Sequence, residues 1–234
     1  MGQIMEALER SRVADNTIFI FTSDNGCSPR AEFDELDAVG HKPGGIYRGN
    51  KADAYEAGHR VPFIVHWPDG VKAGLVSDTT ICLTDLFATM ADITGATTPD
   101  NAAEDSVSFL SALKGKKDQV REGTVHHSIN GSFAIRSGDW KLLLCPGSGG
   151  WSDPRPAAAK NMNLPPIQLF NLATDPSETK NVYASNKDKV KELYQLLESY
   201  VANGRSTPGP KQSNEGATPI DPDGFDKLKA ELGL

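Results

Sequence analysis

The chain has 234 residues, a formal net charge of −7 and 38% hydrophobic residues. This composition is typical of a globular protein with an apolar core and excludes the fibrous and disordered classes. The acidic balance, without a cluster of lysine and arginine, argues against a nucleic-acid partner and against a membrane surface. The three cysteines are too widely spaced for a metal-ligand ladder or a disulfide framework.

The N-terminal part alternates between helix and strand patterns. Apolar residues at helical spacing predict a helix within residues 2–10, and an apolar strand follows over residues 17–22. A second buried strand, bounded by prolines, is expected around residues 63–67. Thr84 is the expected N-cap of a helix that ends at Gly95. This alternation favours an α/β layer.

The pattern changes near residue 118. "SFAIRSGDWKLLL" predicts a hairpin that turns at residues 137–139, and "IQLFN" predicts one more short strand. A helix with apolar residues at helical spacing is expected from Asp188 to Asn203, closed by Gly204. This is an α+β segment. The stretch from Thr207 onward is rich in Pro, Gly, Ser and Asn and is expected to be a poorly ordered or surface extension.

Asp24 and Asn25 directly follow the first strand, in "TIFIFTSDNGCSPR". Ligands of open α/β sheets bind at the carboxyl ends of the strands. The two side chains offer hard oxygens, which suit Ca²⁺ or Mg²⁺ better than zinc or copper, although two oxygens are too few for a calcium site. The alternative is an Asx turn that only closes the strand.

Several motifs occur in a fixed order along the chain: "SDNG", "RGxKxxxxExGxRVPFIVxWP", "TDLxATxADxxG", "HHSxxGSFAIRxGDWKLLLCPGSGGWSDP" and "LFNLATDPSETKNV". Together they resemble the sulfatase family, the formylglycine-dependent arylsulfatases of the alkaline phosphatase superfamily. The resemblance extends to about Gly209, and the matching motifs come from the C-terminal portion of the sulfatase sequences.

The resemblance implies an alkaline-phosphatase-like α/β fold. We expect part of a mixed sheet with flanking helices in residues 1–118, as the C-terminal part of the catalytic domain. A small α+β C-terminal subdomain with an antiparallel sheet and a helix is expected in residues 119–206, followed by the tail of residues 207–234.

The resemblance also implies the roles of single residues. Asp24 and Asn25 would be two ligands of a divalent cation, Ca²⁺ in preference to Mg²⁺. Lys51 would bind the sulfate oxygens, where an ammonium stabilises negative charge on the sulfuryl and leaving oxygens. His126 and His127 begin the second subdomain, and one of them is a candidate substrate contact; a histidine in a satisfied interface is the alternative.

Arg60 and Cys27 have other expected roles. We interpret Arg60 as a structural residue that pairs with Glu56. The sulfatase nucleophile is a formylglycine made from a C-x-P-x-R motif, and in "CSPR" Arg30 directly follows Pro29, so the spacing is wrong. Cys27 is therefore read as a loop thiol. The formylglycine motif and the paired aspartates of the family's N-terminal half have no counterpart here, and the chain by itself is expected to be inactive.

These observations predict a sulfuric ester hydrolase that acts on a sulfate-ester small molecule or a sulfated glycan. One alternative is a phosphate or phosphonate monoester hydrolase of the same superfamily. Another is a non-catalytic fragment that needs a separate N-terminal half. Self-association through an exposed sheet edge is expected in that case, and a periplasmic or secreted location is expected for the full-length enzyme.

Overall fold

A computed structural model describes residues 1–216 and 219–234. The chain forms two compact units, each made of two stretches of sequence. Unit 1 comprises Met1–Ser23 and Pro62–Arg121, and unit 2 comprises Asp24–Val61 and Glu122–Leu234. Because the units interleave, they do not coincide with a linear division at residue 118, and the domain boundaries expected from the sequence stay a prediction.

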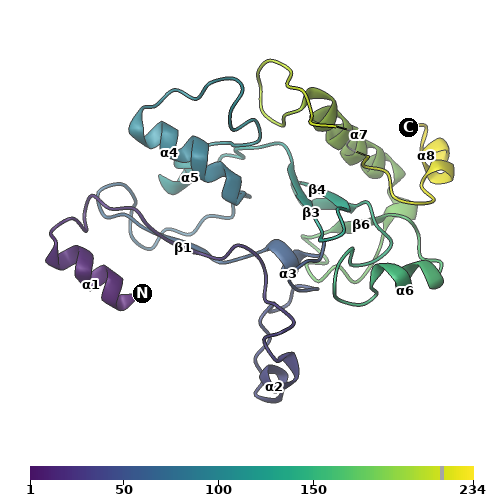
Figure 1. Ribbon diagram of the computed structural model, residues 1–234, viewed down its shortest axis with the longest axis horizontal. Helices are drawn as coiled ribbons and strands as arrows, with labels where there is room; N and C mark the ends of the chain where they lie inside the picture. Colours follow the sequence, from purple (N-terminus) through teal and green to yellow (C-terminus); the bar gives the residue numbers. More distant parts are fainter. Residues whose placement is uncertain (217–218) are drawn as a thin grey trace. The chain divides into compact units, whose positions relative to one another are not determined.

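Unit 1 is built from short elements around a two-stranded sheet (Figure 1). The elements are α1 (Gly2–Arg10), β1 (Phe19–Thr22), β2 (Phe63–His66), η1 (Leu83–Asp85), α4 (Leu86–Thr94) and α5 (Leu110–Leu113). The strands pair antiparallel, with Phe21 opposite Ile64. One face of the pair packs on the helical segment, where Phe63 meets Phe109 edge to face at 5.5 Å. On the other face Phe21 and Ile64 are exposed. Self-association through this sheet stays a prediction.

A buried carboxylate organises the helical part of unit 1. Asp85 accepts hydrogen bonds from the amides of Cys82 (2.7 Å) and Val107 (2.9 Å) and pairs with Arg121 at 3.3 Å. The prediction that Thr84 is the N-cap of the helix ending at Gly95, which is α4, is wrong. Asp85 precedes α4 instead, because a single 3₁₀ turn, η1, comes between the strand-like segment and the helix.

Unit 2 contains the larger sheet. Four antiparallel strands in the order β3-β4-β5-β6 carry α7 against β4 and β5 (Figure 1). The strands are β3 (Thr124–His127), β4 (Phe133–Ser137), β5 (Trp140–Leu143) and β6 (Gln168–Asn171). The remaining elements are α2 (Phe33–Ala38), α3 (Glu56–His59), α6 (Pro156–Asn161), η2 (Tyr183–Ser185), α7 (Lys187–Asn203) and α8 (Asp226–Leu232).

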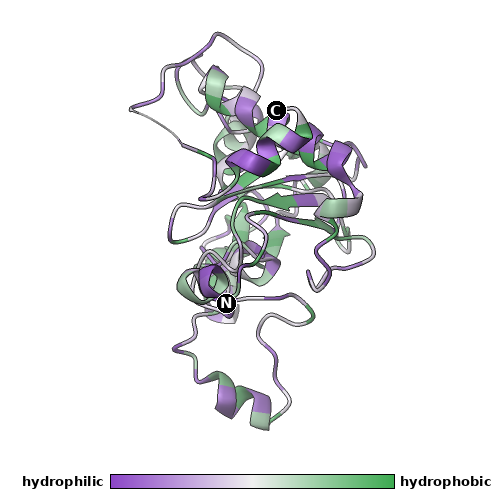
Figure 2. Ribbon diagram, turned by 90° about the vertical axis from the view of Figure 1, so that its right-hand side faces the viewer, coloured by the Kyte–Doolittle hydropathy of each residue, from purple (hydrophilic) through white to green (hydrophobic). Residues whose placement is uncertain are grey.

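The core of unit 2 lies between this sheet and α7. Figure 2 shows hydrophobic colour along the strands and both colours on the helices, as expected where one helix face is buried and the other is solvated. The fully buried side chains include Ile135, Leu142, Leu169, Val190, Leu193, Tyr194 and Leu197. The hairpin, the strand of residues 168–171 and the long helix were all expected from the sequence.

The C-terminal segment differs from the sequence-based expectation. It contains α8, and both Phe225, immediately before that helix, and Leu232 within it are buried in the core of unit 2. The extension is therefore partly packed structure. Residues 217 and 218, which also fall in the expected tail, lie outside the described residues.

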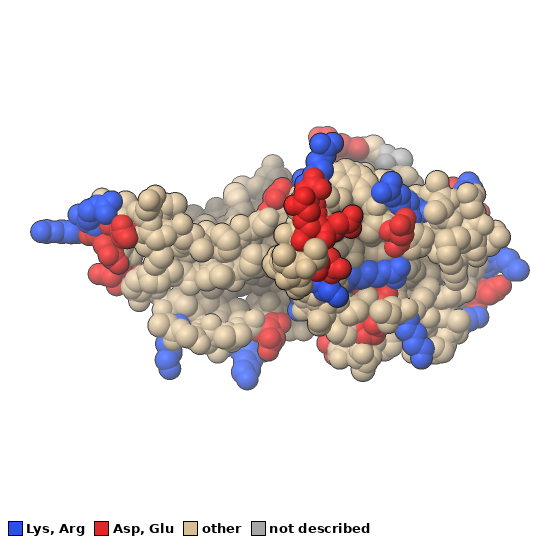
Figure 3. All heavy atoms as spheres, turned by 90° about the horizontal axis from the view of Figure 1, so that it is seen from below, with Lys and Arg blue, Asp and Glu red and all other residues tan. Residues whose placement is uncertain are grey.

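None of the described helices has the length and apolar character needed to cross a bilayer. Charged side chains of both signs are spread over the face in Figure 3, and acidic ones gather at the segment that includes α2. The sequence of α2 contains Asp34, Glu35 and Asp37, all of them exposed.

Candidate active site

Lys51 lies in a tight turn of unit 2. The Asp53 amide donates to the Asn50 carbonyl at 3.2 Å, and the Asn50 amide donates to Asp53 Oδ2 at 2.8 Å. Ala52 has a φ of +84°, the value that the third residue of a type II turn adopts and that usually requires glycine. A strained backbone of this kind persists only where its surroundings fix it. Lys51 is therefore held at a defined position.

The loop that carries Asp24 and Asn25 is bound to this turn by backbone contacts. The Lys51 amide donates to the Cys27 carbonyl at 2.9 Å, and the Gly26 amide donates to the Gly58 carbonyl at 2.9 Å. A Cβ at position 26 would overlap the carbonyl of Ala57, so the loop can approach this closely only with glycine there. The structure thus brings together the three residues that the resemblance assigns to cation and sulfate binding.

Lys51 is half-buried. Among the ion pairs of the described residues, none involves Lys51. In a chain with a net charge of −7, a fixed lysine without a carboxylate partner in the described part is available for an external anion.

Asp53 anchors the turn to the loop after β5. Asp53 is 2% exposed. Its Oδ1 accepts hydrogen bonds from the amides of Trp151 (2.8 Å) and Ser152 (3.1 Å), and its Oδ2 accepts one from the Ser152 hydroxyl (2.5 Å). The Ala54 amide also donates to the Ser148 carbonyl at 2.8 Å. Residues 148–152 therefore form the wall against which the Lys51 turn is built.

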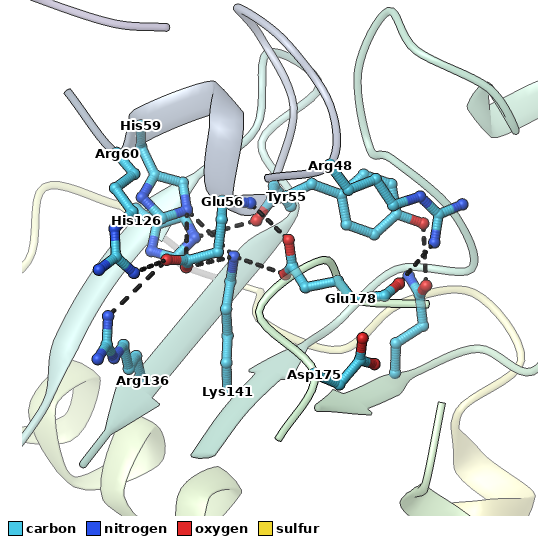
Figure 4. Close-up of polar contacts among 12 residues, drawn as sticks. Arg48, Tyr55, Glu56, His59, Arg60, His126, Arg136, Lys141, Asp175 and Glu178 are labelled. Carbon is cyan, nitrogen blue, oxygen red and sulfur yellow. Dashed lines mark hydrogen bonds and ion pairs between the residues drawn. The ribbon is translucent and has the colours of Figure 1, made fainter. Parts of the chain in front are cut away.

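Helix α3, directly after the turn, is held from below by a buried charge cluster (Figure 4). Lys141 on β5 is fully buried, and its Nζ lies 3.0 Å from Glu56 Oε1, 2.8 Å from Glu178 Oε1 and 3.1 Å from His59 Nε2. The Glu56 amide donates to Glu178 Oε2 at 2.6 Å. Because an ammonium has no lone pair, His59 Nε2 is the acceptor and its ring proton is on Nδ1.

Two arginines complete the cluster on the side of Glu56. Arg60 Nη1 donates to Glu56 Oε2 at 3.0 Å, which is the contact expected from the sequence, and Arg136 Nη1 lies 3.8 Å from the same oxygen. Burial raises the pKa of Glu56, but the charges of Lys141 and the arginines outweigh it and hold the pKa below its usual value. Burial dominates at Glu178, whose pKa is raised.

The two histidines near this cluster have lowered pKa values. The rings of His59 and His126 stack with centroids 3.7 Å apart, and His126 Nε2 lies 3.2 Å from the Ala54 carbonyl. Burial lowers the pKa of His126 to about 3, and the charge of Lys141 acts in the same direction. The pKa of His59 is lowered well below its usual value by burial, by His126 and by Lys141.

His126 and His127 cannot both face one pocket, because successive residues of β3 point to opposite faces of the sheet. His126 points into the charge cluster, and its buried Nδ1 has no hydrogen-bond partner within the described residues. His127 packs edge to face on Phe133, at 4.0 Å between ring centroids. A substrate contact for either residue stays a prediction.

Sequence reasoning missed Asp53, Lys141 and Glu178 as determinants of the site. Signals for the last two were present, since Lys141 lies in "GDWKL" and Glu178 in "DPSE". Those motifs served only to support the resemblance, because nothing in a linear sequence shows that a lysine inside a strand pattern pairs with a glutamate 85 positions earlier.

Within the residues that the structure describes, no three His, Cys, Asp or Glu side chains gather in a way that could hold a metal ion. Asn25 Nδ2 donates to the Gly26 carbonyl at 3.0 Å. Asp24 and Asn25 have the hard oxygens that Ca²⁺ prefers, but they make up only part of a shell of six to eight.

Comparison with known proteins finds relatives of this chain. Residues 1–96 match the family model described as Sulfatase. A curated relative, the N-acetylgalactosamine-6-O-sulfatase of Bacteroides thetaiotaomicron, is 40% identical over 85% of this chain and 39% of its own length. The chain thus spans about two fifths of that relative.

Solved structures show the same fold. One solved structure comes from work on the metabolism of multiple glycosaminoglycans by Bacteroides thetaiotaomicron. It matches with a TM-score of 0.72 and 40% sequence identity, and the match covers 85% of this chain and 41% of the solved chain. Ps i-CgsB in complex with k-i-k-neocarrahexaose matches with a TM-score of 0.65 and 26% sequence identity, and the match covers 92% of this chain and 43% of the solved chain. The fold is that of the alkaline-phosphatase-like α/β proteins. Within that class, the proteins that this chain is similar to are sulfatases.

Proposed function

We propose that the complete gene product carrying this chain hydrolyses sulfate esters of sugars and that Lys51 binds the sulfate group. The observation that carries this proposal is the position of Lys51. Its backbone is held beside the loop of Asp24 and Asn25, and its side chain has no carboxylate partner in the described part. The related N-acetylgalactosamine-6-O-sulfatase supports N-acetylgalactosamine 6-sulfate as the first substrate to test.

In this proposal Lys51 acts by charge. Its ammonium donates hydrogen bonds to the sulfate oxygens and stabilises the negative charge that grows on them and on the leaving oxygen as the S–O bond breaks. The turn of residues 50–53 supplies orientation, because its backbone is fixed before the substrate arrives. The buried cluster around Lys141 holds α3 in place.

Asp24 and Asn25 would hold part of a Ca²⁺ shell through their side-chain oxygens. When bound, such a cation polarises an ester oxygen and orients the reacting groups. The resemblance also implies a formylglycine as the nucleophile. The 234 residues contain no C-x-P-x-R motif, so no residue of this chain is assigned that role.

Release of free sulfate tests the proposal. The complete gene product is incubated with N-acetylgalactosamine 6-sulfate and, separately, with the corresponding 6-phosphate. We expect turnover of the sulfate ester, and we expect Lys51→Ala to lower kcat/KM by about 10²–10³. Lys42→Ala, at an exposed lysine of the preceding loop, is the matched control and keeps full activity. A preference for the phosphate ester, or full activity of Lys51→Ala, would overturn the assignment.

Calcium binding is tested separately by calorimetric titration of the gene product with Ca²⁺. Asp24→Ala is expected to weaken binding, whereas Asp37→Ala removes the same charge from exposed α2 and leaves binding unchanged. Equal affinity in all three proteins would remove Asp24 from the proposed shell.

A further inference from the structure

Trp151 differs from the other two tryptophans of the chain. Trp67 and Trp140 are half-buried, and Trp140 packs against the core of unit 2. Trp151 is 42% exposed. Within the described residues its ring makes no aromatic or cation–π contact. A single exposed apolar residue needs no explanation by itself, but Trp151 is held rigidly next to the Lys51 turn.

The backbone of Trp151 is fixed on both sides. Its amide donates a hydrogen bond to Asp53 Oδ1 at 2.8 Å, and its carbonyl accepts one from Nε of Arg155 at 2.9 Å. A Cβ on the preceding Gly150 would overlap the Ala52 carbonyl and the Asp53 carboxylate, so the chain runs in direct contact with the Lys51 turn. An exposed indole on a rigid backbone binds a ligand at a low cost in conformational entropy.

The same carboxylate positions both Trp151 and Lys51. Oδ1 of Asp53 holds Trp151, while Oδ2 accepts the Asn50 amide and closes the turn that contains Lys51. Lys51 is two residues from Asp53, which limits the separation of their Cα atoms to about 7.6 Å. The backbones that carry a cation without a carboxylate partner in the described part and an exposed aromatic ring are therefore held by one anchor, Asp53.

We infer that Trp151 is a sugar-binding platform that recognises the pyranose ring of the sulfated substrate; this rests on the function proposed above. A pyranose presents a face of C–H bonds, which packs on the electron-rich face of an indole and displaces water from both. Lys51 binds the anionic half of the ligand, and Trp151 binds the neutral half. Trp151 is thereby a specificity-determining residue, which favours sugar sulfates over small alkyl sulfates.

The two product halves test this inference without turnover. The complete gene product is titrated with N-acetylgalactosamine and, separately, with inorganic sulfate, and binding is followed by saturation-transfer NMR for the sugar and by calorimetry for the sulfate. Trp151→Ala is expected to weaken sugar binding about tenfold, equivalent to about 1.4 kcal/mol, and to leave the dissociation constant of sulfate within twofold. Lys51→Ala is expected to show the reverse pattern.

Trp151→Phe keeps an aromatic face and is expected to retain most of the sugar affinity. This variant is the control for misfolding. The anchoring contacts involve only the backbone of residue 151, so the alanine variant is expected to keep them as well. Unchanged sugar binding in Trp151→Ala, or a failure of the wild type to bind the sugar, would overturn the inference. Failure of the proposed function would be seen in a different experiment, the turnover assay, as the absence of sulfate release from N-acetylgalactosamine 6-sulfate.

Discussion

The two units of the chain are stabilised in different ways. Unit 2 has a continuous apolar core between its four-stranded sheet and α7. In unit 1 the buried hydrophobic side chains among the described residues are Phe109 and Ala112, and the other buried ones are Asp85, Thr89 and Arg121. Unit 1 therefore depends on hydrogen bonds and one buried ion pair, Asp85 with Arg121. Unit 2 has an apolar core that supports a charge cluster and a strained turn. The candidate site belongs to the unit with the core.

The largest expected effect comes from the charge cluster of unit 2. Lys141→Met leaves Glu56 and Glu178 buried without their shared cation, and breaking a buried ion pair from one side costs about 3–5 kcal/mol. We expect the free energy of unfolding of unit 2, measured by urea denaturation, to fall by that amount. Lys187→Met, at a surface pair 4.0 Å from Glu231, is the matched control. Equal, small effects of both variants would contradict a structural role for the cluster.

Asp85→Ala tests the polar centre of unit 1 and is expected to cost about 3 kcal/mol, because Arg121 and two amides lose their acceptor. Hydrogen exchange measures the effect for each unit separately. The amides of α4 should lose protection while those of β4 and β5 keep it. Asp92→Ala, on the exposed side of α4, is the control. Loss of protection in both units would show that their stabilities are not separate.

Acid should destabilise unit 2 through its neutral histidines. The pKa values of His59 and His126 lie below the usual 6.5, so the unfolded chain binds protons that the folded chain does not. Their contribution to stability is present above pH 6.5 and is lost as the pH falls toward about 3, the pKa of His126. The loss is up to about 1.4 kcal/mol per pH unit for each histidine.

The measurement is the free energy of unfolding between pH 7 and pH 4. His126→Gln should flatten the pH dependence, and His41→Gln, at an exposed histidine, should leave it unchanged. If the free energy of unfolding of His126→Gln depended on pH as steeply as that of the wild type, His126 would not be the source of the acid destabilisation.

The smallest expected effect concerns the strained turn. Ala52→Gly relieves a positive φ and should change stability by no more than about 1 kcal/mol, in the stabilising direction. Ala91→Gly inside α4 should instead destabilise by about 1 kcal/mol, because glycine loses more entropy in a helix. Thermal melts of the two variants should therefore shift in opposite directions. A destabilised Ala52→Gly would contradict the strain assigned to this turn.

The local elements were predictable where one pattern decides the structure. The hairpin at Gly138 and the helix that ends at Gly204 follow from turn chemistry and from spacing. The burial of Phe225 was not predictable, because a short helix in a segment rich in Pro and Gly is stabilised by the core it joins and not by its own sequence.

The residues of the candidate site could be proposed from the sequence, but their arrangement could not. Asp24, Asn25 and Lys51 were identified from motifs, with the strand end as the expected support. In the structure the support is the contact of Gly26 with Gly58 and of Lys51 with Cys27, together with the hydrogen bonds of Asp53 to a loop about 100 residues later. Pairings over such distances depend on tertiary packing, which the sequence pattern does not contain.

Unit 2 holds the Lys51 turn and the loop of residues 24–27 as one rigid piece. Hydrogen exchange at the amides of Lys51 and Gly26 tests it most directly, because both donate across this contact. We predict protection comparable to that of the β4 and β5 amides, and its selective loss in Asp53→Ala. Rapid exchange of both amides in the wild-type chain would contradict the claim.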